Sequence, residues 1–250
     1  MLAELASQAF WLGLLKIIGV NIILSGDNAV VIALAARSLP AKQQKQAVFW
    51  GAGAAIVLRI LLTIFAAALL SLPWLKLIGS LLLFWIGVKL LIPEEDEDEI
   101  EASEHMMTAI KTILIADLVM SLDNVIAVAA AAGGSYVLLI LGLAISIPLV
   151  IFGATLLIKL MERFPIIITA GAGLIGWVAG EMLVADLAFQ PWFEAMGVQY
   201  KGEHPHVGGM SLEIIAAVIG FIIVVVVGKW LASRKPQAVA EQPADGSARN

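Results

Sequence analysis

The sequence contains no cysteine and only two tyrosines and three histidines among its 250 residues. Without cysteine the chain can form no disulfide and no thiolate metal site, so any metal ion must be held by oxygen or imidazole ligands. Charged residues are also scarce, at 14%, whereas hydrophobic residues make up 61% and the mean hydropathy is +0.98. Because soluble domains carry about 25% charged residues, the composition predicts an all-α, polytopic membrane protein in a lipid bilayer.

The net charge of −5 is concentrated in one short acidic segment at residues 94–101. It therefore says little about the apolar part of the chain, and the sequence offers no basic patch for a nucleic-acid partner. Glu4 stands where a cleaved signal peptide carries basic residues. We expect the first hydrophobic segment to be retained.

Seven apolar runs are long enough to cross a hydrocarbon core of about 30 Å, which takes about 20 helical residues. They lie near residues 10–36, 48–70, 74–92, 107–132, 136–158, 166–185 and 211–231. Basic residues follow the first, fifth and seventh runs: Arg37, Lys42, Lys45, Lys159, Arg163, Lys229, Arg234 and Lys235. The positive-inside rule then predicts that the N-terminus lies outside and the C-terminus in the cytoplasm. We expect the protein to lie in the cell (inner) membrane.

Two three-helix units repeat along the chain, and a seventh helix follows them. Leu72-Pro73-Trp74 and Phe164-Pro165-Ile166 open equivalent helices, and Gly51 aligns more weakly with Gly142. A unit with three spans must be followed by one of opposite orientation, which is the inverted repeat of many secondary transporters. We predict one transmembrane domain over 1–235: repeat one at 10–92, an acidic cytoplasmic linker at 93–106, repeat two at 107–185, an external loop at 186–210 and helix seven at 211–231. Residues 236–250 are predicted to be a disordered cytoplasmic tail.

A polar motif occurs once in each unit, 96 residues apart. Asp27-Asn28 aligns with Asp123-Asn124, and further aligned pairs are Asn21 with Asp117 and Ser25 with Ser121. An ionisable side chain at membrane depth is costly and commonly functional. The duplicated motif is therefore the candidate site.

Helix geometry restricts how the second motif can be arranged. Residues 117, 121 and 124 share one helical face, whereas Asp123 points about 120° away from Asp117 at roughly 100° per residue. Either the two carboxylates face different neighbours or the helix is broken at this point. Gly26 and the Asp-Asn pairs are poor helix formers, which favours a break.

The motif residues together offer many oxygen ligands and almost no other kind. Such a set suits Mn²⁺, Mg²⁺ or Ca²⁺, and crowded buried carboxylates bind protons when the metal ion leaves. We predict a transported divalent cation, no permanently bound cofactor and no catalytic residue. The predicted metal ligands are Asp27, Asn28, Asp117, Asp123, Asn124, Ser121 and Asn21, with Ser25 nearby and Glu181 as an exit or gating ligand.

Each of these residues also has a purely structural explanation. Asn and Ser in membrane helices commonly hydrogen-bond to neighbouring helices. The aspartates could pair with Arg59 in the second predicted helix or Lys89 in the third, and these cations could instead balance Glu181 or extend to an interface.

Ser-Gly-Asp-Asn-Ala-Val in one half and Asp117-Leu-Val-Met-Ser-Leu-Asp-Asn124 in the other resemble the TerC family of integral membrane proteins, in its shorter, YjbE-type branch. The resemblance covers about residues 10–230. It implies manganese efflux, with Asp27, Asn28, Asp117, Asp123 and Asn124 as the functional positions. Asn21 stands where the second half has Asp117, so the two half-sites are not equivalent and the number of metal sites stays open.

Two other functions fit parts of the pattern. Two facing aspartates can activate water in an intramembrane aspartyl protease, although that chemistry needs no Asn and Ser partners. A membrane scaffold that aids the metallation of exported proteins is the other alternative. Ion selectivity, coupling ion, direction of flux and assembly into a homo-oligomer are left open by the sequence.

Overall fold

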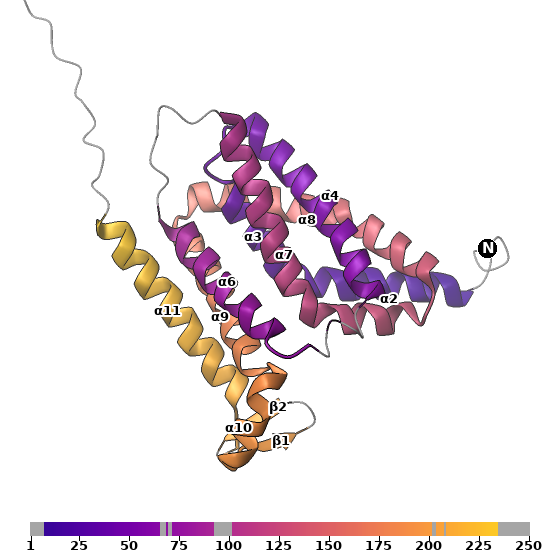
Figure 1. Ribbon diagram of the computed structural model, residues 1–250. Coiled ribbons are helices and arrows are strands. Elements are labelled where there is room, and N and C mark those ends of the chain that lie inside the picture. Colours follow the sequence, from indigo (N-terminus) through magenta and orange to yellow (C-terminus); the bar gives the residue numbers. More distant parts are fainter. Residues whose placement is uncertain are drawn as a thin grey trace, which may run out of the picture.

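The computed structural model describes residues 8–65, 69, 72–92, 102–201, 204–207 and 209–234, which form ten helices and one small sheet (Figure 1). The prediction of an all-α polytopic membrane protein is confirmed. The long helices are α2 (Gln8–Leu24), α3 (Gly26–Ala36), α4 (Ala41–Ile64), α6 (Leu75–Leu91), α7 (Ala102–Ala132), α8 (Tyr136–Arg163), α9 (Ile166–Val184) and α11 (Leu212–Arg234).

Helix ends differ from the predicted ones where polar turns extend a helix beyond its apolar run. Helix α4 begins at Ala41 rather than near residue 48, because the turn containing Lys42 and Lys45 is helical as well. Helix α7 begins at Ala102, so the end of the linker predicted for 93–106 is already helical. The rest of that linker, 93–101, and the tail predicted for 236–250 lie outside the described residues.

Among the described residues, fewer helices than the seven predicted are long enough to span a membrane alone. Five of the described helices are, and α2 with α3, which meet at an angle of 51°, supply a sixth span as a bent pair. Helix α6 has 17 residues and is therefore about 25 Å long at 1.5 Å per residue. It occupies the third predicted run but falls short of the usual spanning length.

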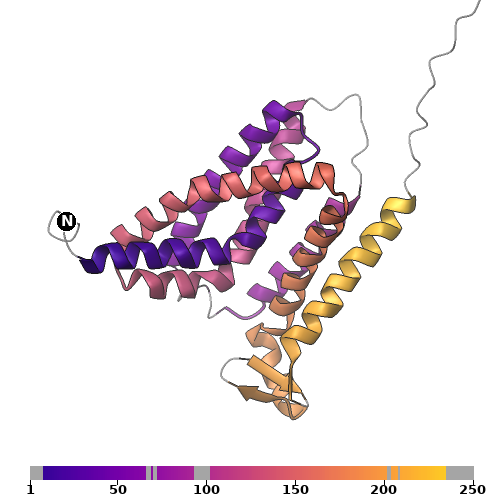
Figure 2. The same cartoon turned by 180° about the vertical axis from the view of Figure 1, so that it is seen from behind.

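The two predicted repeats pack on each other reciprocally. Helix α4, second in repeat one, packs on α7, which is first in repeat two. In return α8, second in repeat two, packs on α2 and α3, and the third helices α6 and α9 pack together (Figures 1 and 2). A two-fold relation between the units requires this exchange of partners.

Equivalent glycines mark the closest of these contacts. A Cβ atom added to Gly51 in α4 would lie 2.8 Å from Cδ1 of Ile113 in α7, and one added to Gly142 in α8 would lie 2.5 Å from Cγ2 of Ile17 in α2. Ile17 and Ile113 are 96 residues apart, the same offset as the polar motifs. Small residues let membrane helices approach closely, and here the weak alignment of Gly51 with Gly142 corresponds to one shared packing contact.

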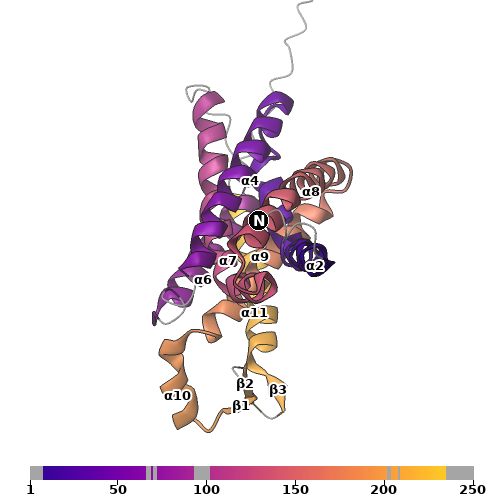
Figure 3. The ribbon, with the colours of Figure 1, turned by 90° about the vertical axis from the view of Figure 1, so that its right-hand side faces the viewer.

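Helix α11 lies outside the repeats, along α9 and α6. Backbones meet there, since a Cβ on Gly176 would lie 2.5 Å from the carbonyl oxygen of Gly220. The predicted external loop contains η1 (Leu187–Phe189), α10 (Gln190–Ala195) and strands β1 (Gln199–Lys201), β2 (His204–Val207) and β3 (Met210–Ser211), which pair antiparallel in that order. Figure 3 shows this part at one end of the molecule, and in Figure 1 α6 and α11 run away from it toward their C-terminal ends.

The outer surface carries many large apolar side chains. Ile23 is 80% exposed and Phe152 is 69% exposed, and exposed large apolar residues occur on every long helix except α3. An exterior with many large apolar side chains suits hydrocarbon rather than water. The polar groups of the helices must then be satisfied inside, where the candidate site lies.

Candidate functional site

Six polar or charged residues lie buried together where α2, α3, α4 and α7 meet. They are Asn21, Ser25, Asn28, Arg59, Asp117 and Ser121, each at most 5% exposed. Five of the six belong to the duplicated motif, and both copies contribute. Side chains from both copies of the motif therefore meet in the protein interior, and their binding of a metal ion stays a prediction.

The first copy of the motif sits at a break between two helices. Helix α2 ends at Leu24, and Ser25 leaves helical geometry, with φ −106° and ψ 4°, before α3 begins at Gly26. The break removes the intrahelical partner of the Leu24 carbonyl oxygen. Two aligned amides replace it, because Asn28 Nδ2 lies 3.5 Å and Asn124 Nδ2 lies 3.3 Å from that oxygen.

The second copy is not broken. Helix α7 continues through Asp123 and Asn124 to Ala132, although Figures 1 and 2 show that its C-terminal part changes direction and runs beside α2. The predicted break therefore occurs in the first copy only. Gly26 distinguishes the two sequences, since Leu122 stands at the aligned position of the unbroken helix and Gly is the poorer helix former.

Arg59 of α4 lies at the centre of the cluster and binds both halves. Its Nη2 forms a 2.5 Å ion pair with Oδ1 of Asp117, and its Nε donates to Oγ of Ser121 at 3.0 Å. Its Nη1 donates to Oδ1 of Asn21 at 2.8 Å and to Oγ of Ser25 at 3.0 Å. The predicted alternative of an aspartate balanced by Arg59 is thus realised at Asp117.

A cavity of about 10 Å³ remains beside these groups. Its lining comprises Asn21, Ser25, Asn28, Ile32, Ala52, Ala55, Ile56, Arg59, Asp117 and Val150. Among the described residues, Asn28 Oδ1 and Asn21 Nδ2 are buried here without a hydrogen-bond partner. Buried polar atoms are rarely left unsatisfied, so an acceptor such as Asn28 Oδ1 marks a place for a cationic or hydrogen-bonding ligand.

The aspartates of the motif differ in their surroundings. Asp27 is half-buried in the first turn of α3, its Oδ1 accepts the N–H of Asn28 at 2.8 Å, and it is close enough to Arg59 and Asp117 to interact with their charges. The side chain of Asp123 lies outside what the structure describes. The described residues contain no group of three or more acidic, histidine or cysteine side chains placed to hold a metal ion, so the role of Asp123 as a third carboxylate stays a prediction.

Glu181 is not among the residues that line this cavity. Its Oε1 accepts the indole N–H of Trp177 at 2.8 Å within α9. At the aligned positions of α6, the ammonium group of Lys89 lies 5.3 Å from the centre of the Trp85 ring. The same Trp-x-x-x-charge spacing thus carries opposite charges in the two repeats, and a gating role for Glu181 stays a prediction.

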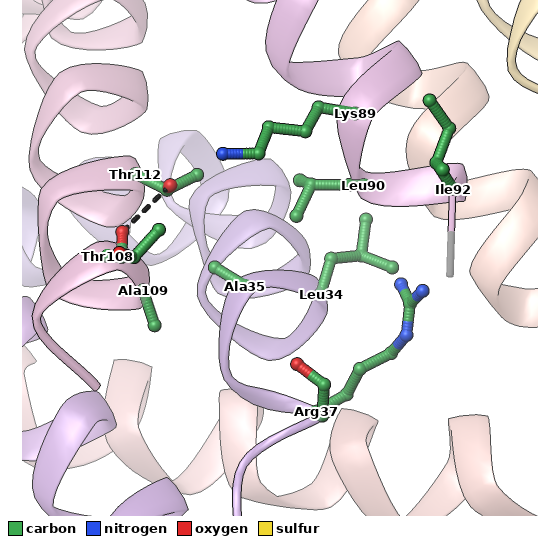
Figure 4. A pocket seen from close by; sticks show the side chains of 10 residues that line it. Leu34, Ala35, Arg37, Lys89, Leu90, Ile92, Thr108, Ala109 and Thr112 are labelled. Carbon is green, nitrogen blue, oxygen red and sulfur yellow. Dashed lines mark hydrogen bonds between the residues drawn. The ribbon is translucent and has the colours of Figure 1, made fainter. Parts of the chain in front are cut away.

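A larger cavity of about 230 Å³ lies between the ends of α3, α6 and the start of α7 (Figure 4). Arg37 and Lys89 line it together with Thr108 and Thr112, and Figure 4 shows the amino group of Lys89 directed toward Thr112. Two basic side chains make this lining unfavourable for a divalent cation. Sequence reasoning did not single out this cavity.

Asp186, which follows α9, connects the two repeats. Its carboxylate is 3% exposed and accepts N–H groups of Trp74, Leu77 and Ala188 at 2.8 to 2.9 Å, two of them at the start of α6. Burial raises the pKa of this carboxyl, but the hydrogen bonds from Ala188, Leu77 and Trp74 outweigh burial and hold the pKa below its ordinary value. Asp186 therefore has a structural role that sequence reasoning missed.

Fold and site together define a polytopic α-helical membrane protein with a charged, oxygen-rich cluster enclosed between two repeated units. The chain belongs to the integral membrane protein TerC family, which it matches over residues 6–236. This finding confirms the resemblance of its paired motifs.

Bacillus subtilis (strain 168) has several similar membrane proteins. YjbE is 46% identical over 177 residues, which cover 71% of this chain and 81% of YjbE. YkoY is 29% identical over 208 residues, covering 74% of this chain and 63% of YkoY, and YceF is 26% identical over 230 residues, covering 88% and 84%. No solved structure matches the chain.

Proposed function

We propose that this protein exports a divalent metal cation, most favourably Mn²⁺, from the cytoplasm in exchange for protons. The observation that carries the proposal is the buried cluster, in which an unpartnered amide oxygen of Asn28 and the carboxylate of Asp117 line one cavity formed by both repeats. Placing such groups inside a membrane protein is costly unless a ligand uses them. The TerC resemblance adds manganese as the expected cargo.

The donor chemistry supports a hard cation. The described cluster offers carboxylate, amide and hydroxyl oxygens from Asp117, Asn21, Asn28, Ser25 and Ser121. Oxygen ligands suit Mn²⁺, Mg²⁺ and Ca²⁺, and the absence of thiols disfavours softer ions. A midplane site between inverted repeats is the arrangement in which rocking of one unit against the other gives alternating access.

The ion pair at Asp117 weighs against the protease alternative. An aspartyl protease needs two carboxylates that share a proton, whereas Asp117 is paired with the guanidinium of Arg59. The scaffold alternative has no feature of the described residues in its favour.

Reconstituted protein tests the proposal. Purified full-length chain in liposomes is expected to move Mn²⁺ across the bilayer with opposite proton movement, read by a metal-sensitive dye inside and a pH dye outside. Asp117→Asn should abolish the flux, since its carboxylate is the buried anion of the site.

Two serines provide a matched control. Ser121 and Ser146 are both fully buried, but Ser121 contacts Arg59 and Asp117 whereas Ser146 donates only to the carbonyl oxygen of Gly142 in its own helix. Ser121→Ala should slow Mn²⁺ flux and Ser146→Ala should not. Absence of metal-dependent flux through the unmodified protein, or full flux through Asp117→Asn, would refute the proposal.

A further inference from the structure

Arg59 is the only described cation in the buried cluster, and it is enclosed almost completely. Its side chain is 3% exposed, and its backbone carbonyl oxygen accepts the hydroxyl of Thr63 at 2.7 Å. A guanidinium stays charged in any protein environment. A permanent positive charge inside a membrane helix is costly and therefore calls for a function.

The acceptors that surround Arg59 are the ones that a metal ion would need. All four of its side-chain hydrogen bonds end on motif residues, two from each repeat: Asn21, Ser25, Asp117 and Ser121. Arg59 is thus coordinated by the oxygen atoms that form the candidate cation site.

The space in the cluster does not admit a second cation beside the guanidinium. The remaining cavity measures about 10 Å³, which is about the smallest volume that holds one water molecule. A divalent ion placed there would meet a positive charge and oxygen atoms already engaged by N–H groups. Metal ion and guanidinium must therefore alternate.

The second repeat has no such cation. Gly51 and Gly142 set an offset of 91 residues for the second helices of the repeats, and this offset aligns Arg59 with Val150. Val150 lines the same cavity. One half therefore supplies a charge to the shared site where the other supplies the apolar side chain of Val150, so the guanidinium is a feature of one half and not of the repeated scaffold.

We propose that Arg59 is a tethered counter-cation, which occupies the site when no metal ion is bound and which the divalent cation displaces. This inference rests on the proposed metal transport and deepens it. The guanidinium balances the charge of Asp117 in the empty protein, and its withdrawal is part of loading. The affinity for metal is then set by competition within one molecule.

Metal binding to Arg59 variants tests the inference. Free Mn²⁺ is measured by electron paramagnetic resonance over purified full-length protein in nanodiscs. Arg59→Gln is expected to bind Mn²⁺ about tenfold more tightly than the unmodified chain, as follows if the guanidinium holds the empty site about 90% of the time. Arg59→Lys should bind Mn²⁺ with nearly the affinity of the unmodified protein, because the competing charge is retained. Ser146→Ala, the control, should bind Mn²⁺ as tightly as the unmodified protein.

Guanidinium chloride at low millimolar concentration is the second arm. It should weaken Mn²⁺ binding to Arg59→Gln, whose site is vacated, and have much less effect on the unmodified protein. Equal or weaker Mn²⁺ binding by Arg59→Gln would overturn the inference.

The third arm of the experiment uses the unmodified protein, so it needs no variant to fold correctly. Phenylglyoxal modification of Arg59 in the unmodified protein, followed by mass spectrometry, should become faster when Mn²⁺ is added, since the guanidinium then leaves its partners. Unchanged or slower modification would overturn the inference.

The outcomes separate the two proposals. If the unmodified protein and Arg59→Gln both bind no metal and transport none, the proposed function fails. If the unmodified protein transports Mn²⁺ but Arg59→Gln gains no affinity for Mn²⁺, only the role of Arg59 fails.

Discussion

The two repeats share their packing and differ in their charges. Gly51 meets Ile113 as Gly142 meets Ile17, so the helices of both units approach each other at equivalent points. At the polar site, however, Asn21 aligns with Asp117 and Arg59 aligns with Val150. The two halves share these packing contacts, whereas at the polar site the aligned residues named here differ in charge or, at Gly26 and Leu122, at the helix break.

This contrast indicates which part of the molecule carries the function. A symmetric set of contacts allows two equivalent arrangements of one unit against the other, as alternating access requires. An asymmetric site gives one ion pair rather than two, and hence a single place where a cation can reside. The predictions below test the difference between frame and site.

The largest expected effect comes from moving the carboxylate between halves. Asp117→Asn leaves the guanidinium of Arg59 buried without its ion-pair partner, which should lower the free energy of unfolding by about 3–5 kcal/mol. Asn21→Asp in the same chain should restore much of this loss, because Asn21 Oδ1 already lies 2.8 Å from Nη1 of Arg59. Denaturation in detergent measures the free energy of unfolding of both variants. If Asn21→Asp combined with Asp117→Asn is no more stable than Asp117→Asn alone, the two positions are not equivalent.

The second-largest effect is expected at Asp186, whose hydrogen bonds link the end of repeat two to the start of α6. Asp186→Asn should cost about 1.5–3 kcal/mol, the usual range for hydrogen bonds to a charged group. The folded-state pKa of Asp186 lies below its ordinary 3.8, so its contribution is present above that pH and is lost as the pH falls through the folded value. Thermal melts at pH 7 and pH 3 should show a large difference between variant and unmodified protein at pH 7 and a smaller one at pH 3; an equal difference at both would refute the assignment.

The shared packing should respond alike in both halves. Gly142→Ala and Gly51→Ala each place a methyl group against an isoleucine and should cost about 1–3 kcal/mol by overpacking. Ile17→Ala removes the Cγ2 atom that the first variant would meet, and Ile113→Val removes the Cδ1 atom that the second would meet, so each should relieve the clash of its partner variant. Gly53→Ala is the control, since a Cβ atom there would meet no atom within 4 Å; strong destabilisation by Gly53→Ala would point to another cause.

The smallest effect concerns the two amides at the break. Asn28→Ala and Asn124→Ala each remove one donor to the Leu24 carbonyl oxygen and should cost about 0.5–1.5 kcal/mol. Because both donors share one acceptor, the double variant should lose more than the sum of the two. Strict additivity in a double-mutant cycle would show that the amides act on separate groups.

The sequence predicted the frame well because its signals are long and periodic. Seven apolar runs and a 96-residue repeat indicate helices and their order. Helix ends were missed where polar turns such as that of Lys42 remain helical. The sequence also predicted a loop at 186–210, whose short strands carry no strong apolar alternation.

The proximity of some motif residues was predicted from the sequence, whereas their role as metal ligands stays a prediction. The duplicated motif identified Asn21, Ser121 and Asp117 as partners, and the structure places them around one group. The central position of Arg59 could not be read from the motif, because the contacts join residues 34 to 62 positions apart. A lone arginine within an apolar run was the available signal, and it indicated importance but not the partner.

Diffraction from Mn²⁺-soaked crystals, recorded at a wavelength where manganese scatters anomalously, tests the central claim most directly. The account predicts one strong peak within bonding distance of Asp117 and Asn28, with the Arg59 guanidinium moved away from Asp117. A map with no peak among α2, α3, α4 and α7, or with its peak elsewhere and Arg59 still paired to Asp117, would contradict it.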